Sequence, residues 1–146
     1  MRRSFRILAV NVSERSGEQK HPVERARLRE NHGIVGDAHA GDWHRQVSLL
    51  AEEEIDTMRG KGVELHYGDF AENITTRGVD LASLPVGTRL HLGEVLLEVT
   101  QIGKECHHGC AIRQAVGDCV MPRKGIFARV LQGGEISGES ECYYDL

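Results

Sequence analysis

Hydrophobic and polar residues alternate over short segments along most of the chain, and many glycines separate these segments. A period of two is the pattern of a strand that buries one face. On this basis we predict strands over 5–12, 46–50, 71–75, 89–92, 95–101, 126–131 and, near the end, 141–144. Strands this short and numerous favour a mainly β protein built as a closed or nearly closed β-barrel, with one or two short helices.

The segment SLLAEEEIDTMRGKG has the pattern of a helix rather than a strand. We predict that it begins at Ser48 as the N-cap, because serine side chains accept hydrogen bonds from the first helical N–H groups. Acidic residues at 52–54 suit the positive end of the helix dipole, and Gly60 is a typical C-cap. A second, shorter helix is predicted over 111–116, closed by Gly117.

Composition limits the chain to one ordinary folding unit. It has 146 residues, of which 40% are hydrophobic and 27% charged, as in soluble globular proteins. Nothing repeats and no low-complexity linker interrupts the pattern, so we expect a single domain over 1–146. The formal net charge is −4, with both signs mixed along the chain, which argues against a general nucleic-acid-binding protein.

The N-terminal stretch MRRSFRILAVNV resembles a signal peptide in its basic start, but only ILAV is continuously apolar and no small-residue cleavage site follows. We therefore expect it to be the first strand. No window approaches the roughly 18 apolar residues of a membrane span, so no membrane association is expected. These features predict a cytoplasmic protein whose thiols are reduced.

The first polar segment with candidate chemistry is GIVGDAHAGDWHRQVSL, whose glycines predict a tight loop. It matches neither the GxGxxG dinucleotide fingerprint nor the GxxxxGK[ST] phosphate loop. Asp37, His39 and His44 are of types that bind metal ions, although such side chains in polar loops also serve as turn formers and hydrogen-bonding groups. Both interpretations stay open at this point.

Two further polar groups lie beside predicted strands. Arg45 and Gln46 lie where the loop enters a strand, and the Arg45 guanidinium could bind a phosphate or carboxylate through two hydrogen bonds, or form an exposed salt bridge. In GDFAENI, the polar residues Glu72 and Asn73 lie between apolar neighbours. The Asn73 amide could offer a donor and an acceptor to a heterocycle, or it could cap the barrel end.

The segment VTQIGKECHHGC concentrates cysteine and histidine. The spacing Cys106-x3-Cys110-x8-Cys119, with Cys142 far downstream, lacks the paired CxxC knuckles of structural zinc sites. A reducing compartment disfavours a disulfide framework. Zinc bound by Cys106, His107, Cys110 and Cys119 stays an alternative.

A reactive thiolate at Cys106 fits the residues better. Cys106 follows a predicted strand, with Lys104 two residues before it and His107 beside it. Nearby cationic groups favour the thiolate, which is the form that attacks sulfur or binds soft metal ions. A cysteine flanked by such polar residues is not the pattern of an inert buried side chain.

Taken together, these motifs resemble the MOSC domain, the module at the C-terminus of molybdenum cofactor sulfurases that also occurs as stand-alone bacterial proteins. The resemblance covers nearly the whole chain. It rests on ILAVNVS, GIVGDAHAG, RQVSLL, GDFAENI, LPVGTRLHLGEVLLEVTQ and the cysteine that follows. GKECHHGC, GDCVMP and GIFARVLQGGEI are similar to a subgroup of small stand-alone members. The resemblance implies a β-barrel related to the barrel domain of pyruvate kinase.

The resemblance also implies a site for the molybdenum cofactor, a pterin-bound molybdenum. Cys106 matches the family's cysteine and would be the molybdenum ligand or a persulfide carrier, with Lys104 and His107 supporting its chemistry. The residues expected near the cofactor are Asp37, His39, Arg45, Gln46 and Asn73. Cys110 and Cys119 are additions of the subgroup.

The expected function is cofactor sulfuration, or sulfur carriage and delivery, through this cysteine. The chain shows no pyridoxal-phosphate domain, so a partner cysteine desulfurase or a cofactor-synthesis or acceptor enzyme is expected. One alternative is a molybdenum-dependent reductase component acting on N-hydroxylated compounds. Another is a zinc-based or thiol-based binding module without molybdenum.

Overall fold

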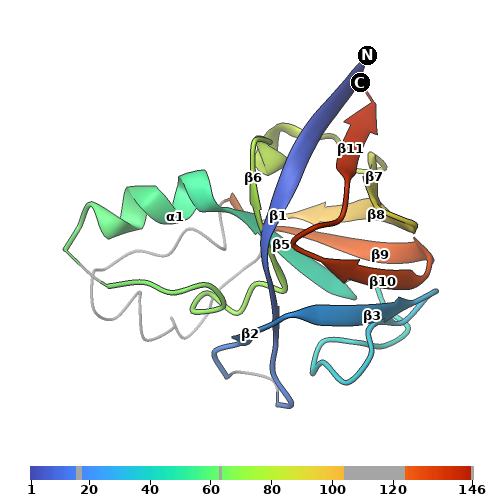
Figure 1. Cartoon of the computed structure of the whole chain (residues 1–146), viewed down its shortest axis with the longest axis horizontal. Helices are drawn as coiled ribbons and strands as arrows, with labels where there is room; N and C mark the ends of the chain where they lie inside the picture. Colours follow the sequence, from blue (N-terminus) through green and yellow to red (C-terminus); the bar gives the residue numbers. More distant parts are fainter. Residues whose placement is uncertain (16–17, 63, 104–123, 146) are drawn as a thin grey trace.

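Seven strands close into a β-barrel in the computed structural model, which describes residues 1–15, 18–62, 64–103 and 124–145 (Figure 1). The barrel strands are β1 (Arg2–Val12), β5 (Val47–Ala51), β6 (Ile74–Arg77), β7 (Arg89–Leu92), β8 (Val95–Ile102), β9 (Ile126–Gln132) and β11 (Cys142–Asp145). Their order around the barrel is β11-β7-β8-β9-β5-β6-β1, and β1 pairs with β11 to close it. Among the pairings of the described residues, only β5 and β6 run parallel. The predicted barrel is confirmed, and most of the predicted strands lie close to the observed ones, whereas the strand predicted over 71–75 begins only at Ile74.

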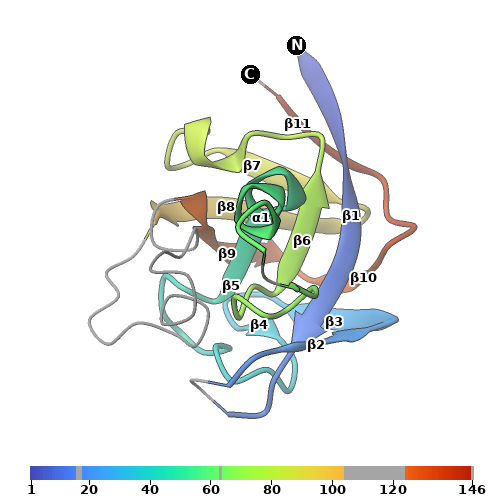
Figure 2. The same cartoon turned by 90° about the vertical axis from the view of Figure 1, so that its left-hand side faces the viewer.

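The remaining strands among the described residues lie outside this ring and escaped the sequence-based prediction. β3 (Arg25–Arg29) pairs with β4 (Gly33–Ile34) and β10 (Gly134–Ser137), while β2 (His21–Val23) pairs with β1. β3 lies at the lower side of the molecule in both views (Figures 1 and 2). Three of the five β3 residues are arginines, so its alternation buries only two side chains and gives a weak signal.

The predicted helix is shorter than expected. α1 (Glu52–Arg59) has its acidic first turn and its C-cap at Gly60, as predicted. The prediction of Ser48 as N-cap is wrong: Ala51 is the N-cap, without a side-chain hydrogen bond, because β5 continues to that residue. A single 3-10 turn follows later as η1 (Leu81–Ser83). The helix predicted over 111–116 lies outside the described residues.

None of the helices in the described part of the chain is long and apolar enough to cross a membrane.

The wall formed by β1, β5 and β6 is buried on both faces. Leu49 and Ile74 belong to the buried apolar core. Because side chains alternate along a strand, Ser48 and Thr75 point to the other side, away from that core. This outer side is nevertheless buried, since α1 contacts both β5 and β6 and the connection from α1 to β6 folds back onto the wall (Figure 2). The fold therefore places polar side chains in a dry layer outside the barrel.

Candidate functional site

A layer of buried polar side chains covers the outer face of β1, β5 and β6. We call Asn11, Ser48, Glu72, Asn73 and Thr75 the polar layer. The Asn73 Oδ1 accepts hydrogen bonds from the Ser48 N–H at 2.9 Å and the Ser48 hydroxyl at 3.2 Å, and its Nδ2 donates to the Asn11 carbonyl at 3.1 Å. Asn73 is fully buried and joins β5 to β1 immediately before β6 begins.

Glu72 lies in the same layer without an ion-pair partner among the described residues. Its carboxylate accepts hydrogen bonds from the N–H groups of Gly68 and Phe70 and from the Thr75 hydroxyl, at 3.0, 3.2 and 2.8 Å. Burial raises the pKa of Glu72, and these donors only partly oppose that shift. The carboxylate thus organises the turn that leads into Asn73.

Gly68 allows that turn to approach the loop after β1. Its φ is +92°, and a Cβ there would lie 2.2 Å from the Lys20 carbonyl oxygen. Only glycine meets both conditions without a shift of the backbone. The Lys20 N–H also donates to the Gly68 carbonyl at 2.9 Å, so the two loops are joined by their backbones.

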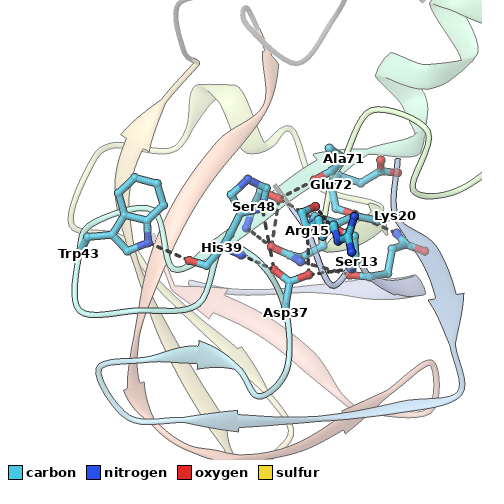
Figure 3. A network of polar contacts seen from close by, with 11 residues as sticks. Ser13, Arg15, Lys20, Asp37, His39, Trp43, Ser48, Ala71 and Glu72 are labelled. Carbon is cyan, nitrogen blue, oxygen red and sulfur yellow. Dashed lines mark hydrogen bonds and ion pairs between the residues drawn. The ribbon is translucent and has the colours of Figure 1, made fainter. Parts of the chain in front are cut away.

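A buried ion pair forms the second polar feature (Figure 3). The Lys20 Nζ lies 2.8 Å from the Asp37 carboxylate, and neither side chain is exposed. Asp37 also accepts hydrogen bonds from the N–H groups of Ser13 and His39. Burial alone would raise the pKa of Asp37, but Lys20 and the two N–H donors outweigh it and hold that pKa below its usual value. The pair fixes the loop after β4, which continues to Arg45.

A different arrangement lies where β8 ends. We call His44, Arg45 and Gln101 the strand-end cluster. The Gln101 Oε1 lies 2.9 Å from His44 Nε2 and accepts a hydrogen bond from Arg45 Nε at 3.2 Å, while its Nε2 donates to the Gly103 carbonyl at 2.8 Å. The Gly103 N–H donates to the Gly125 carbonyl at 2.6 Å. The cluster therefore lies at the two ends of the segment 104–123.

The guanidinium of Arg45 is held but not saturated. It is half-buried and lies over the Phe127 ring, 5.2 Å from its centroid. Its Nε is bonded to Gln101, whereas its two terminal nitrogens have no partner within the residues that the structure describes. Beside the cluster, an open groove of about 420 Å³ is lined by His44, the exposed Trp43 and Val86, and Thr100 of β8, among other residues.

The predicted site residues separate between these features. Asp37 and His39 come together around the buried ion pair, and Asn73 belongs to the polar layer. Arg45 lies in the strand-end cluster, while the neighbouring Gln46 turns the other way. The buried Gln46 donates to the Asn31 side chain and accepts from the Val130 N–H. Direct cofactor contacts by these residues stay predictions.

The predicted cysteine chemistry lies outside the described residues, because Lys104, Cys106 and His107 belong to the segment 104–123, as do Cys110 and Cys119. Sequence reasoning missed Gln101 as a member of the site. Its position in VTQIGK, at the end of a strand that leads to the cysteines, was the available signal.

The alternative metal site in the glycine-rich loop does not form. Asp37 forms an ion pair with Lys20, and His44 contacts Gln101. Within 1–15, 18–62, 64–103 and 124–145, no group of three or more His, Cys, Asp or Glu side chains could hold a metal ion.

The fold and the site define a class: a small β-barrel protein in which an arginine lies beside the start of a segment that contains cysteines. The family model of the MOSC domain matches residues 36–142. The chain therefore belongs to the MOSC domain family.

Solved structures support the same fold. The YuaD protein from Bacillus subtilis has a TM-score of 0.82 at 18% identity, covering 99% of this chain and 97% of that chain. YiiM from Geobacillus stearothermophilus has a TM-score of 0.74 at 20% identity, covering 97% of this chain and 75% of that chain. For YiiM from Escherichia coli the values are 0.70 and 17%, with coverage of 98% and 70%. No curated protein sequence gives a significant match.

Proposed function

We propose that this protein binds the molybdenum cofactor and acts in cofactor sulfuration, or in sulfur carriage and delivery, through Cys106. Membership of the MOSC family supports the cofactor class. The observation that carries the proposal is the strand-end cluster: an unsaturated guanidinium lies at the base of the segment that contains Cys106. We expect the protein to work in the cytoplasm with a partner protein.

Chain length permits Arg45 and Cys106 to belong to one site. Cys106 follows Gly103 by three residues, and three residues span at most roughly 11 Å. Gly103 is bonded directly to Gln101, which holds Arg45. A ligand with an anionic end and a metal end could therefore meet both Arg45 and Cys106.

The chemistry of the residues fits the cofactor. The terminal N–H groups of Arg45 suit its phosphate, because a guanidinium can bind two phosphate oxygens at once. The Cys106 thiolate is a suitable soft ligand for molybdenum, which is the centre that the bound cofactor supplies. Asp37, His39, Gln46 and Asn73 are proposed to shape the pocket through the backbone that their buried hydrogen bonds hold.

Sulfur carriage requires Cys106 to receive sulfur. In the proposed step, the Cys106 thiolate attacks the outer sulfur of a persulfide on a partner cysteine desulfurase. The S–S bond of the donor breaks and the donor leaves as a thiolate, so Cys106 becomes the persulfide without an external oxidant. Lys104 and His107 would favour the Cys106 thiolate electrostatically.

The test compares the wild type with Cys106→Ser after anaerobic co-expression with the cofactor-synthesis proteins. Molybdenum is measured by metal analysis and pterin by fluorescence. We expect both in near-stoichiometric amounts in the wild type, and loss of molybdenum in Cys106→Ser with an unchanged circular dichroism spectrum. Retention of the metal and of sulfur transfer in the folded variant would refute the role of Cys106.

Cys142 provides the matched control. It is buried in the barrel core, and burial raises its pKa to about 12, so it is thiol rather than thiolate at neutral pH. Cys142→Ala should keep the cofactor and accept sulfur as the wild type does. Persulfide labelling that depends on Cys142 would contradict the assignment.

The same preparations separate the two alternatives. Stoichiometric zinc without pterin, lost together with the fold on chelation, would support a zinc or thiol module. Turnover of an N-hydroxylated base by the loaded protein with a reductase would support the reductase component. Neither result is expected from a sulfur carrier.

A further inference from the structure

We propose that Gln101 is a positioning residue, which holds the Arg45 guanidinium, with His44 beside it, ready to bind an oxyanion such as a phosphate ester. This inference deepens the proposed function, since it names the residue that prepares the anion end of that site. It is carried by the three hydrogen bonds of one amide group.

The orientation of the Gln101 amide follows from its partners. The Gly103 carbonyl can only accept a hydrogen bond, so it faces the Gln101 Nε2. The Arg45 Nε always carries hydrogen, so it faces the Gln101 Oε1. Both partners agree on one orientation, which leaves no freedom to flip the amide.

That orientation also determines which nitrogen of His44 carries hydrogen. The His44 Nε2 lies 2.9 Å from Gln101 Oε1, which can only accept, so Nε2 must donate. The Nδ1 is then a proton acceptor in the neutral ring and a second donor in the charged ring. Gln101 thus fixes the tautomer of His44 that carries hydrogen on Nε2.

The arrangement leaves Arg45 prepared for a ligand. The Nε bond to Gln101 and the Phe127 ring hold the guanidinium plane, and its two terminal nitrogens have no partner among the described residues and are available as donors. Two parallel N–H donors are suited to phosphate or carboxylate oxygens, and fixing them beforehand lowers the entropy cost of binding.

The charged residues near the strand-end cluster indicate that Arg45, and not the adjacent groove, binds the oxyanion. Asp42, Glu98 and Arg129 line the adjacent groove with His44. Glu98 is paired with Arg129 at 2.8 Å, and the Asp42 carboxylate accepts a hydrogen bond from Asn31. The charged side chains that line the groove therefore sum to −1, so the groove itself does not attract an oxyanion, and the guanidinium of Arg45 is the positive group that can bind one.

The experiment measures binding of inorganic pyrophosphate to the cofactor-free full chain by calorimetry. Fluorescence of Trp43, the only tryptophan in the sequence, is a second signal, because its ring centroid lies 5.8 Å from that of His44. We expect Arg45→Gln to weaken binding by roughly tenfold to hundredfold, as for a lost charged hydrogen bond. Gln101→Leu should weaken it by about tenfold.

A double-mutant cycle distinguishes positioning from general support of the fold. If Gln101 acts through Arg45, the double variant Gln101→Leu, Arg45→Gln should bind within about twofold of Arg45→Gln alone. If the loss of affinity in the double variant is the product of the two single losses, the proposal is overturned. Unchanged binding in Gln101→Leu, or no binding by the wild type, would also overturn it. Gln132→Leu is the matched control, since Gln132 bonds the Glu94 carbonyl outside the cluster and should not affect binding.

This test is independent of sulfur chemistry. Pyrophosphate contains neither metal nor sulfur, so its binding reports on the anion end of the site. If pyrophosphate binds as expected while sulfur transfer is absent, the anion site stands and the sulfur function fails. If sulfur transfer occurs but Gln101→Leu binds pyrophosphate normally, the positioning role fails alone.

Discussion

The polar layer and the strand-end cluster are both rich in hydrogen bonds. They differ in how many donor groups remain available to a ligand. Asn73 and Glu72 are fully buried and direct their polar atoms to the chain itself, and within the polar layer only the buried Asn11 Oδ1 has no hydrogen-bond partner among the described residues. Arg45 is half-buried and keeps two nitrogens without a partner in the described chain. Saturated groups stabilise the fold, whereas unsaturated groups at the surface are available to a ligand. Changes in the first region should therefore affect stability, and changes in the second should affect binding.

The largest expected effect concerns the buried ion pair of Lys20 and Asp37, which belongs with the polar layer to the buried, stabilising part of the molecule. Asp37→Asn leaves the Lys20 charge buried without its partner, so we expect a loss of about 3 to 5 kcal/mol in the free energy of unfolding. Chemical denaturation measures this loss. The double variant Lys20→Met, Asp37→Asn should recover more than half of it, because the isolated charge is removed. Equal stability of the two variants would contradict this explanation.

The two buried carboxylates should respond to pH in opposite directions. The pKa of Asp37 is lowered in the fold, so its contribution is present above the unfolded value and is lost as the pH falls through the folded one. The pKa of Glu72 is raised, so stability falls as the pH rises from the unfolded value to the folded one. The slope within that window is at most about 1.4 kcal/mol per pH unit for one group.

Glu72→Gln tests whether the raised pKa of Glu72 makes the protein less stable as the pH rises. Between pH 4 and pH 8, the free energy of unfolding of Glu72→Gln should no longer show the decrease with rising pH that Glu72 causes. At lower pH, Asp37→Asn should no longer show the decrease with falling pH that Asp37 causes. A Glu72→Gln profile parallel to that of the wild type would show that the carboxyl group does not change its proton affinity on folding.

The smallest effect is expected beside the strand-end cluster, at the pair of Glu98 and Arg129. Their side chains are 22% and 49% exposed, so solvent screens the interaction. Glu98→Gln should change the free energy of unfolding by less than about 1 kcal/mol. A thermal melt is sufficient to test this, and a large destabilisation would mean that the groove wall supports the fold.

Much of the barrel could be predicted because its strands alternate clearly. The hairpin of β7 and β8 was predicted almost to the residue, with Gly93 and Glu94 between its strands. β3 was missed because arginines occupy three of its five positions. Ser48 was misassigned because a serine before a run of acidic residues fits a helix N-cap locally, whereas its true partner, Asn73, lies 25 residues away.

The site was harder to predict, because its residues are far apart in the sequence. Arg45 was identified from its residue type, but Gln101 is 56 residues away and is joined to it only by the barrel. Likewise, the buried pairing of Lys20 with Asp37 depends on two loops packed together by tertiary structure. Residue types therefore indicated the chemistry, and the fold determined which groups are saturated.

The most direct test of the comparison measures pterin content and stability together in Arg45→Gln and Ser48→Ala, each co-expressed with the cofactor-synthesis proteins. Ser48→Ala removes hydroxyl bonds to Asn73 and Ala71, so it should melt earlier while its folded fraction retains pterin. Arg45→Gln should melt like the wild type and lose most of its pterin. A folded Ser48→Ala variant without pterin, next to an Arg45→Gln variant that keeps it, would contradict the assignment of the ligand to the strand-end cluster.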